Sequence, residues 1–168
     1  MSTASEWVLT PVPTPLDARE LLSGLLGREV TVQQVTSAFV GDVGAGTTYA
    51  VYQDDQARTR AVAVMDLKMS AYAGAAIGLM PVGAAEIAIE ESDLPPVMKE
   101  NLYEVLNVLA ALLNAPDCPH VKLTSVTHVG GSPEAEVAAH ATAVGRRLDL
   151  EVAVPQFGTG RLSIVGLK

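Results

Sequence analysis

Residues 96–114, PVMKENLYEVLNVLAALLN, carry the clearest helical pattern in the chain. Six aliphatic residues recur at steps of three and four, so one helix would bury them all on one side: Leu102, Val105, Leu106, Leu109, Leu112 and Leu113. A second series with the same spacing lies on the opposite side, and we call it the seam: Glu100, Glu104, Asn107, Ala111 and Asn114. The stretch therefore predicts a helix with a buried apolar stripe and an exposed, mostly polar seam.

Asn107 is the unusual member of the seam. Asn is a weak helix former because its side chain competes with the backbone for hydrogen bonds, so other residues would suit a purely solvated position better. Its amide offers a donor and an acceptor in fixed geometry, which suits the positioning of one water molecule. Glu104, one turn earlier, offers an anionic group to a cationic partner. A surface helix whose polar side is simply solvated is the alternative interpretation.

The composition favours one domain with an aliphatic core. The chain has 168 residues, of which 49% are hydrophobic but only 4% are aromatic. Charged residues make up 18%, a low share that leaves room for an apolar surface covered by a partner or a second subunit. We therefore expect a homodimer.

The charge and the cysteine content exclude several classes of function. A formal net charge of -8 argues against nucleic acids and anionic membranes as partners, because both require clustered Lys and Arg. The single cysteine, Cys118, allows no intrachain disulfide, and no apolar stretch is long enough to span a bilayer. We expect a cytoplasmic protein. Cys118 and His120 form the only metal-like pair and lack further ligands, so we expect no metal site.

The rest of the chain alternates between helical and strand patterns. Residues 1–15 contain three prolines and predict an extended or partly disordered arm, whereas residues 16–168 predict a single domain. Helices are expected at 16–26, 68–79, 82–90 and 133–144, and strands at 29–35, 47–52, 58–66, 121–129, 148–154 and 161–165. The glycine-rich segment 41–46 lacks the residues of a phosphate-binding loop and predicts a turn. The predicted class is α/β (α+β), with an antiparallel sheet covered by helices.

Two parts of the chain resemble each other. Residues 25–27 followed by VTVQQVT (30–36) are similar to residues 112–114 followed by VKLTSVT (121–127), and in both cases a helix leads into a strand. This faint repeat predicts two pseudo-symmetric halves.

Over residues 16–166 the chain resembles the CheC/CheX/FliY family of chemotaxis phosphatases, and it is most similar to CheX. The resemblance rests on RAVAVMDL (60–67), ENLYEVLNVLAALLN (100–114) and LEVAVPQFGTGRLSIV (150–165). Glu104 and Asn107 match the family's Glu-x-x-Asn pair. Three positions differ from the family pattern: Glu100 replaces an Asp or Ser, Ala111 replaces a Gly, and Gly130 stands where the family has a proline.

The resemblance implies a reaction and a partner. The family hydrolyses the phosphoaspartate of a CheY-type response-regulator receiver domain, so Glu104 would dock against the regulator's active-site lysine and Asn107 would orient the attacking water. The remaining seam residues, Glu100, Ala111 and Asn114, are expected to contact the partner. The divalent metal ion, such as Mg, would belong to the receiver domain, so the chain would need no cofactor of its own.

Two alternatives stay open at this point. The first is a non-catalytic CheC-like binding module with a degenerate site, and the second is a purely structural dimer with a solvated seam. The first helix carries Glu20 and Ser23 at the same spacing but no Asn, so the resemblance implies one site per chain.

Overall fold

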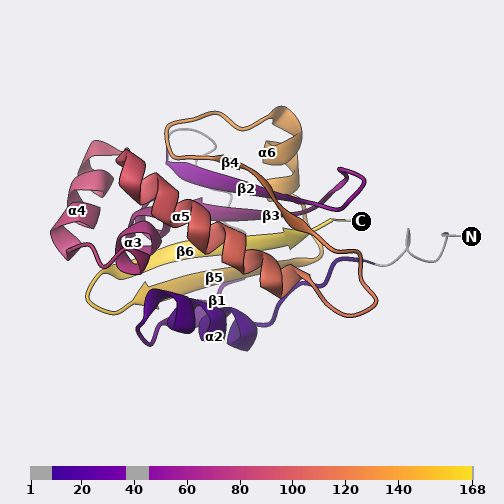
Figure 1. Ribbon diagram of the computed structural model, residues 1–168, viewed down its shortest axis with the longest axis horizontal. Helices are drawn as coiled ribbons and strands as arrows, with labels where there is room; N and C mark the ends of the chain where they lie inside the picture. The colour runs from indigo at the N-terminus through magenta and orange to yellow at the C-terminus, as the bar shows by residue number, and fades with distance from the viewer. Residues whose placement is uncertain (1–8, 37–45, 168) are drawn as a thin grey trace, which may run out of the picture.

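The computed structural model describes residues 9–36 and 46–167. The helices in this part are α2 (Pro15–Leu26), α3 (Leu67–Ile77), α4 (Val82–Glu91), α5 (Pro96–Leu109), the 3-10 helix η1 (Ala110–Leu113) and α6 (Ala135–Ala141). The strands are β1 (Thr31–Gln34), β2 (Thr47–Gln53), β3 (Thr59–Asp66), β4 (Lys122–Thr127), β5 (Arg147–Val154) and β6 (Gly158–Gly166). Helices α2, α3 and α5 lie over one face of the sheet, and α4 lies beside α3 near the start of α5 (Figure 1).

The six strands form one antiparallel sheet in the order β1-β5-β6-β3-β2-β4. Strand β4, which follows α5, pairs with the β2–β3 hairpin, whereas β1, which follows α2, pairs with the β5–β6 hairpin. The first half of the chain, from α2 to α3, therefore gives β1 to the β5–β6 hairpin, and the second half, from α4 to β6, gives β4 to the β2–β3 hairpin. The two halves meet where β3 pairs with β6. This arrangement confirms the predicted α+β class and agrees with the internal repeat.

The apolar stripe of the central helix lies in the main core, as predicted. Five of its six members are at most 1% exposed, and Leu112 is partly buried: the five are Leu102, Val105, Leu106, Leu109 and Leu113. They share this core with one face of the central strands, where Ala61, Ala63 and Met65 alternate along β3. Because two of these three strand residues are alanines, α3 and α5 approach the sheet closely.

A smaller cluster lies on the other face of the sheet, where α6 contacts β3. The helix expected over residues 133–144 is shorter in the structure: the N-cap of α6 is Glu134, which makes no side-chain capping bond. The guanidinium of Arg147 donates to the carbonyls of Ala141 and Ala143 at 3.1 and 2.7 Å. These bonds satisfy carbonyls at the end of α6, so the helix stops before Val144.

Two predictions fall on residues outside the described part of the chain. These are the arm over residues 1–8 and most of the turn at 41–46. Of the arm, Thr10 is fully buried and its carbonyl accepts a hydrogen bond from Arg146. Helix α2 then begins at Pro15, where Thr14 and Asp17 form a capping box.

The small residues of α3 permit two close backbone contacts. A Cβ atom at Gly74 would lie 2.8 Å from the carbonyl oxygen of Met98 in α5. A Cβ atom at Gly160 in β6 would lie 2.5 Å from the backbone nitrogen of Met69 in α3. Helix α3 is therefore held between α5 and the sheet at distances that only glycine allows.

We predict that Gly160→Ala and Gly74→Ala each lower the free energy of unfolding by about 1–3 kcal/mol, because backbone atoms must move to admit the methyl group. Gly83→Ala in α4 is the matched control. No atom lies within 4 Å of a Cβ at this position, so this change should be neutral or should stabilise the helix by up to about 1 kcal/mol. Urea denaturation measures all three, and equal stability of the three variants would contradict the packing described here.

Candidate functional site

Four of the five seam residues lie on the solvent side of α5 and η1, as the helical spacing predicts. Glu100, Glu104, Asn107 and Ala111 are all exposed. Two apolar side chains flank them on the same helix, Val97 at 50% and Tyr103 at 44% exposure. Because α5 crosses the covered face of the sheet with its stripe inward, its outward side presents the seam along the length of the helix (Figure 1).

Three of the four polar side chains of the seam have no polar partner among the residues that the structure describes. Within residues 9–36 and 46–167, the side chains of Glu100, Glu104 and Asn107 form no hydrogen bond or ion pair. Glu104 and Asn107 are three residues apart on one helix, so they are neighbours on its surface. The pair can therefore present an anionic group and an amide side by side to another molecule.

Asn114 differs from the rest of the seam. The predicted helix over 96–114 is too long: α5 ends at Leu109, η1 continues to Leu113, and the backbone of Asn114 is extended. The Asn114 amide donates to the carbonyls of Ala110 and Val121 and accepts from the Val121 nitrogen, at 2.9, 3.0 and 2.9 Å. The two bonds to Val121 connect the end of η1 to the approach to β4, and the third returns to the first residue of η1, so the Asn114 amide is already used within the fold.

Two residues that sequence reasoning missed hold α5 in position. The hydroxyl of Tyr52, a fully buried side chain of β2, donates to the carbonyl of Leu106 at 2.5 Å. Burial raises the pKa of this phenol far above its usual value, so the donor proton is retained. The side-chain amide of Asn101 donates to the carbonyl of Gly74 in α3 at 2.9 Å. No local pattern marked either residue, because their partners lie 54 and 27 residues away in the sequence.

The Tyr52 hydrogen bond lies near the end of α5, where the α-helix changes to the 3-10 helix η1. The backbone N–H of Ala110 donates to the carbonyl of Asn107, as in a 3-10 turn, rather than to Leu106 four residues back. The Leu106 carbonyl instead accepts the Tyr52 hydroxyl. Leu106 directly precedes Asn107, so the hydrogen bond to the Leu106 carbonyl fixes the backbone that carries the Asn107 amide.

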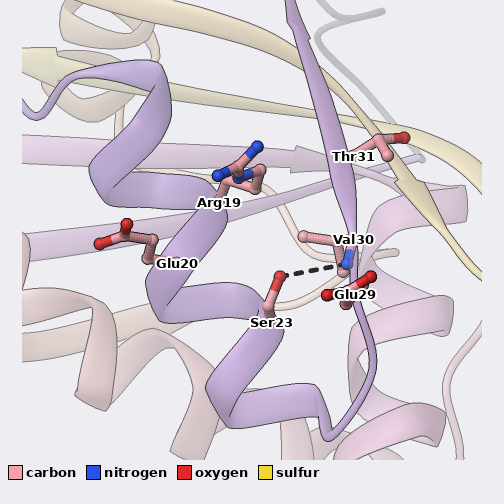
Figure 2. Close-up of a pocket in the computed structure, with 6 residues that line it drawn as sticks. All are labelled: Arg19, Glu20, Ser23, Glu29, Val30 and Thr31. Atoms are coloured by element: carbon pink, nitrogen blue, oxygen red, sulfur yellow. Dashed lines mark hydrogen bonds between the residues drawn. The ribbon is translucent and has the colours of Figure 1, made fainter.

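Helix α2 carries no counterpart of the Glu104–Asn107 pair, since Ser23 stands at the position of the Asn. A cavity of about 380 Å³ lies between α2 and β1, and it is lined by Arg19, Glu20, Ser23, Glu29, Val30 and Thr31 (Figure 2). Ser23, the counterpart of Asn107 in spacing, accepts a hydrogen bond from the backbone N–H of Val30 at 3.1 Å. Its hydroxyl therefore connects the helix to the strand that follows.

The Cys118 and His120 pair lines a separate groove of about 250 Å³ beside the β2–β3 turn. Asp54, in the same groove, already binds the guanidinium groups of Arg58 and Arg60 at 3.1 and 2.8 Å. Burial alone would raise the pKa of Asp54, but hydrogen bonds from the Arg58 and Gln56 backbone and from both guanidinium groups lower it to about 2. In the described part of the chain, no group of three or more His, Cys, Asp or Glu side chains is arranged to hold a metal ion.

Comparison with solved structures identifies the fold. Neither a family model nor a curated protein matches the sequence. A chain of the CheX–CheY–BeF3–Mg complex from Borrelia burgdorferi is similar in structure, with 12% identity, a TM-score of 0.52 and coverage of 92% of this chain and 96% of that chain. FliY from Thermotoga maritima gives 13% identity, a TM-score of 0.54 and coverage of 89% and 82%.

The chain has the CheC/CheX/FliY fold. A chain of the FliM–SpeE complex from H. pylori shares it, with 11% identity, a TM-score of 0.56 and coverage of 89% and 82%. Among the residues that the structure describes, there is no helix of the length and apolarity needed to cross a membrane.

We predict that Tyr52→Phe lowers the free energy of unfolding by about 1–2 kcal/mol, because it removes the donor from a buried carbonyl while keeping the ring. Urea denaturation measures the change. Tyr103→Phe is the matched control, since this hydroxyl is carried by a side chain that is 44% exposed. A Tyr52→Phe variant as stable as Tyr103→Phe would contradict the role given to this hydrogen bond.

Proposed function

We propose that the chain promotes hydrolysis of the phosphoaspartate on a CheY-type receiver domain. The observation that carries this proposal is the exposed Glu104–Asn107 pair, whose side chains form no hydrogen bond or ion pair with the described part of the fold. The similarity to a chain of a CheX–CheY–BeF3–Mg complex supports it, since that complex joins a protein of this fold to CheY.

The proposed chemistry requires little of the chain itself. Asn107 inserts its amide next to the acyl phosphate, where the amide oxygen accepts a hydrogen bond from the attacking water and the NH₂ group donates to a phosphate oxygen. As the water oxygen bonds to phosphorus, the bond between phosphorus and the aspartate oxygen breaks, and the receiver's carboxylate is the leaving group. Glu104 pairs with a lysine of the receiver's active site and fixes the approach of the helix. The metal ion that neutralises charge on the phosphoryl group belongs to the receiver, so the chain holds no cofactor of its own.

Ala111 and Glu100 limit how a partner approaches the pair. Ala111 is exposed one turn after Asn107, so its methyl group lies on the path toward the amide from that side. Glu100 lies one turn before Glu104 and adds a second carboxylate to the seam. The proposed receiver must therefore approach over Glu100 and Glu104, with cationic groups facing them.

A second candidate function is a non-catalytic binding module. It is favoured by the similarity to a chain of the FliM–SpeE complex, in which a protein of this fold is bound to a protein other than CheY. In this case the seam binds a partner without hydrolysis. If instead the seam is only solvated, replacing Glu104 and Asn107 together would alter neither binding nor hydrolysis.

We predict that the wild-type protein accelerates the decay of acyl phosphate on its receiver domain and that Asn107→Ala reduces this acceleration about 100-fold, because the water is no longer held in line. Phosphate release from phosphorylated receiver domains measures the rate. Gln34→Ala, which removes an exposed amide from β1, is the matched control and should behave as wild type. Binding without acceleration by the wild-type protein would favour the binding module instead.

We also propose that the chain forms a homodimer through an outer strand of the sheet. In the described residues β1 and β4 are the outer strands, and β4 exposes Lys122, Thr124 and Ser125. An outer strand presents unpaired N–H and C=O groups that a second copy can pair.

Light scattering should give a mass about twice the 17.5 kDa of one chain. Ser125→Lys on β4 should shift the mass toward one chain, because Lys on an outer strand opposes pairing between sheets. A single-chain mass for the wild-type protein at all concentrations would contradict the dimer.

A further inference from the structure

An apolar groove lies between α4 and the segment that leads into α5. It has a volume of about 410 Å³ and is lined by Ala84, Ile87, Ala88, Glu91, Asp93 and Pro95. Ile87 is 57% exposed, so a large aliphatic side chain remains in contact with water at the edge of this groove. Burying this surface against a partner would be favourable.

The groove is surrounded by negative charge. Residues 82–107 contain six carboxylates, all exposed, and one basic side chain: Glu86, Glu90, Glu91, Asp93, Glu100 and Glu104, together with Lys99. Lys99 is already paired with Asp93 at 3.8 Å. The surface therefore has a strong negative potential that a cationic partner would neutralise.

Two of these carboxylates lie where helix stability disfavours them. Glu90 and Glu91 form the last two residues of α4, whose final turn has no basic side chain. The C-terminal end of a helix carries a partial negative charge, so acids at this position are destabilising and Lys or Arg would be preferred. Since these acids oppose the stability of their own helix, their placement is better explained by an interaction with another molecule.

The groove and the seam form one continuous surface. Pro95 lines the groove, and Val97, two residues further on, is half exposed in the first turn of α5. Glu100 and Glu104 follow Val97 at steps of three and four, so they continue along the same side of the helix. A partner seated over Glu104 and Asn107 therefore extends naturally onto α4.

A second copy of the chain does not fit this surface. A symmetric interface places the same patch of both copies face to face, so six carboxylates would oppose six carboxylates. Like charges brought together in this way strongly disfavour association. The occupant must instead be a different protein with basic residues.

We propose that the α4 groove is the affinity-determining part of the receiver-docking surface. It accepts an apolar side chain of the receiver domain, while Lys or Arg residues beside that side chain pair with Glu90 and Glu91. This inference rests on the proposed function, because it takes the receiver domain as the partner. The α4 groove then determines the affinity for the receiver, and Asn107, on α5, supplies the chemistry.

The test measures how tightly BeF3–Mg-loaded receiver domains bind the wild-type protein, the Ile87→Ala variant and a double variant of Glu90 and Glu91. Calorimetry gives the three dissociation constants at 50 and 300 mM salt. Ile87→Ala should weaken binding about 5- to 10-fold at both salt concentrations, because it removes apolar surface. Glu90→Lys combined with Glu91→Lys should weaken binding at least 10-fold at 50 mM salt, and this loss should shrink at 300 mM. The same double variant should raise the thermal midpoint, since it favours the helix dipole, so weaker binding cannot be attributed to unfolding.

Matched controls on other elements separate the groove from general surface effects. Leu16→Ala removes an exposed aliphatic side chain from α2, and Glu134→Lys with Glu136→Lys reverses two exposed charges at the start of α6. Both control proteins should bind as wild type.

Receiver binding that neither α4 variant weakens would overturn this inference and leave the proposed function standing. Binding that depends on α4 without accelerated hydrolysis would uphold this inference and contradict the phosphatase, and no binding of any receiver domain would overturn both.

Discussion

The hydrogen bond from the buried Tyr52 hydroxyl to the Leu106 carbonyl anchors α5 to the sheet at the point on which the candidate site depends. Asn101 makes a second anchor, on α3, one and a half turns earlier in the helix. Gly74 and Gly160 allow α3 to lie close enough to both α5 and β6 for these bonds to form. The inner side of α5 is thus fixed at several points, so its outer side presents Asn107 from a rigid element rather than a loop.

Local patterns were enough to predict most of the fold, because each one reports a strong physical preference. The apolar stripe from Leu102 to Leu113 predicted the core side of α5, and the strands expected at 47–52 and 58–66 form β2 and β3. Errors arose where distant contacts override local preference. Arg147 ends α6 early, and the amide of Asn114 bonds Val121 instead of extending the helix.

The candidate site was predictable in part for the same reason. Helical spacing alone gave the exposure of Glu104 and Asn107, since a period of 3.6 residues assigns each position to a side. Spacing did not identify Tyr52 or the α4 groove, because both depend on elements that meet only in the folded chain. The predicted helix over 82–90 stops one residue before Glu91, whereas Glu91 is the last residue of α4 and lines an apolar groove that adjoins the seam.

The proposed function places the contact with a receiver domain on the outer side of α5. The most direct measurement is the NMR spectrum of the labelled protein during titration with a BeF3–Mg-loaded receiver. The account predicts that the side-chain NH₂ resonances of Asn107 and the backbone resonances around Glu104 shift, together with those of Glu90 and Glu91. Shifts confined to β4 or α6, with the α5 resonances unchanged, would contradict it.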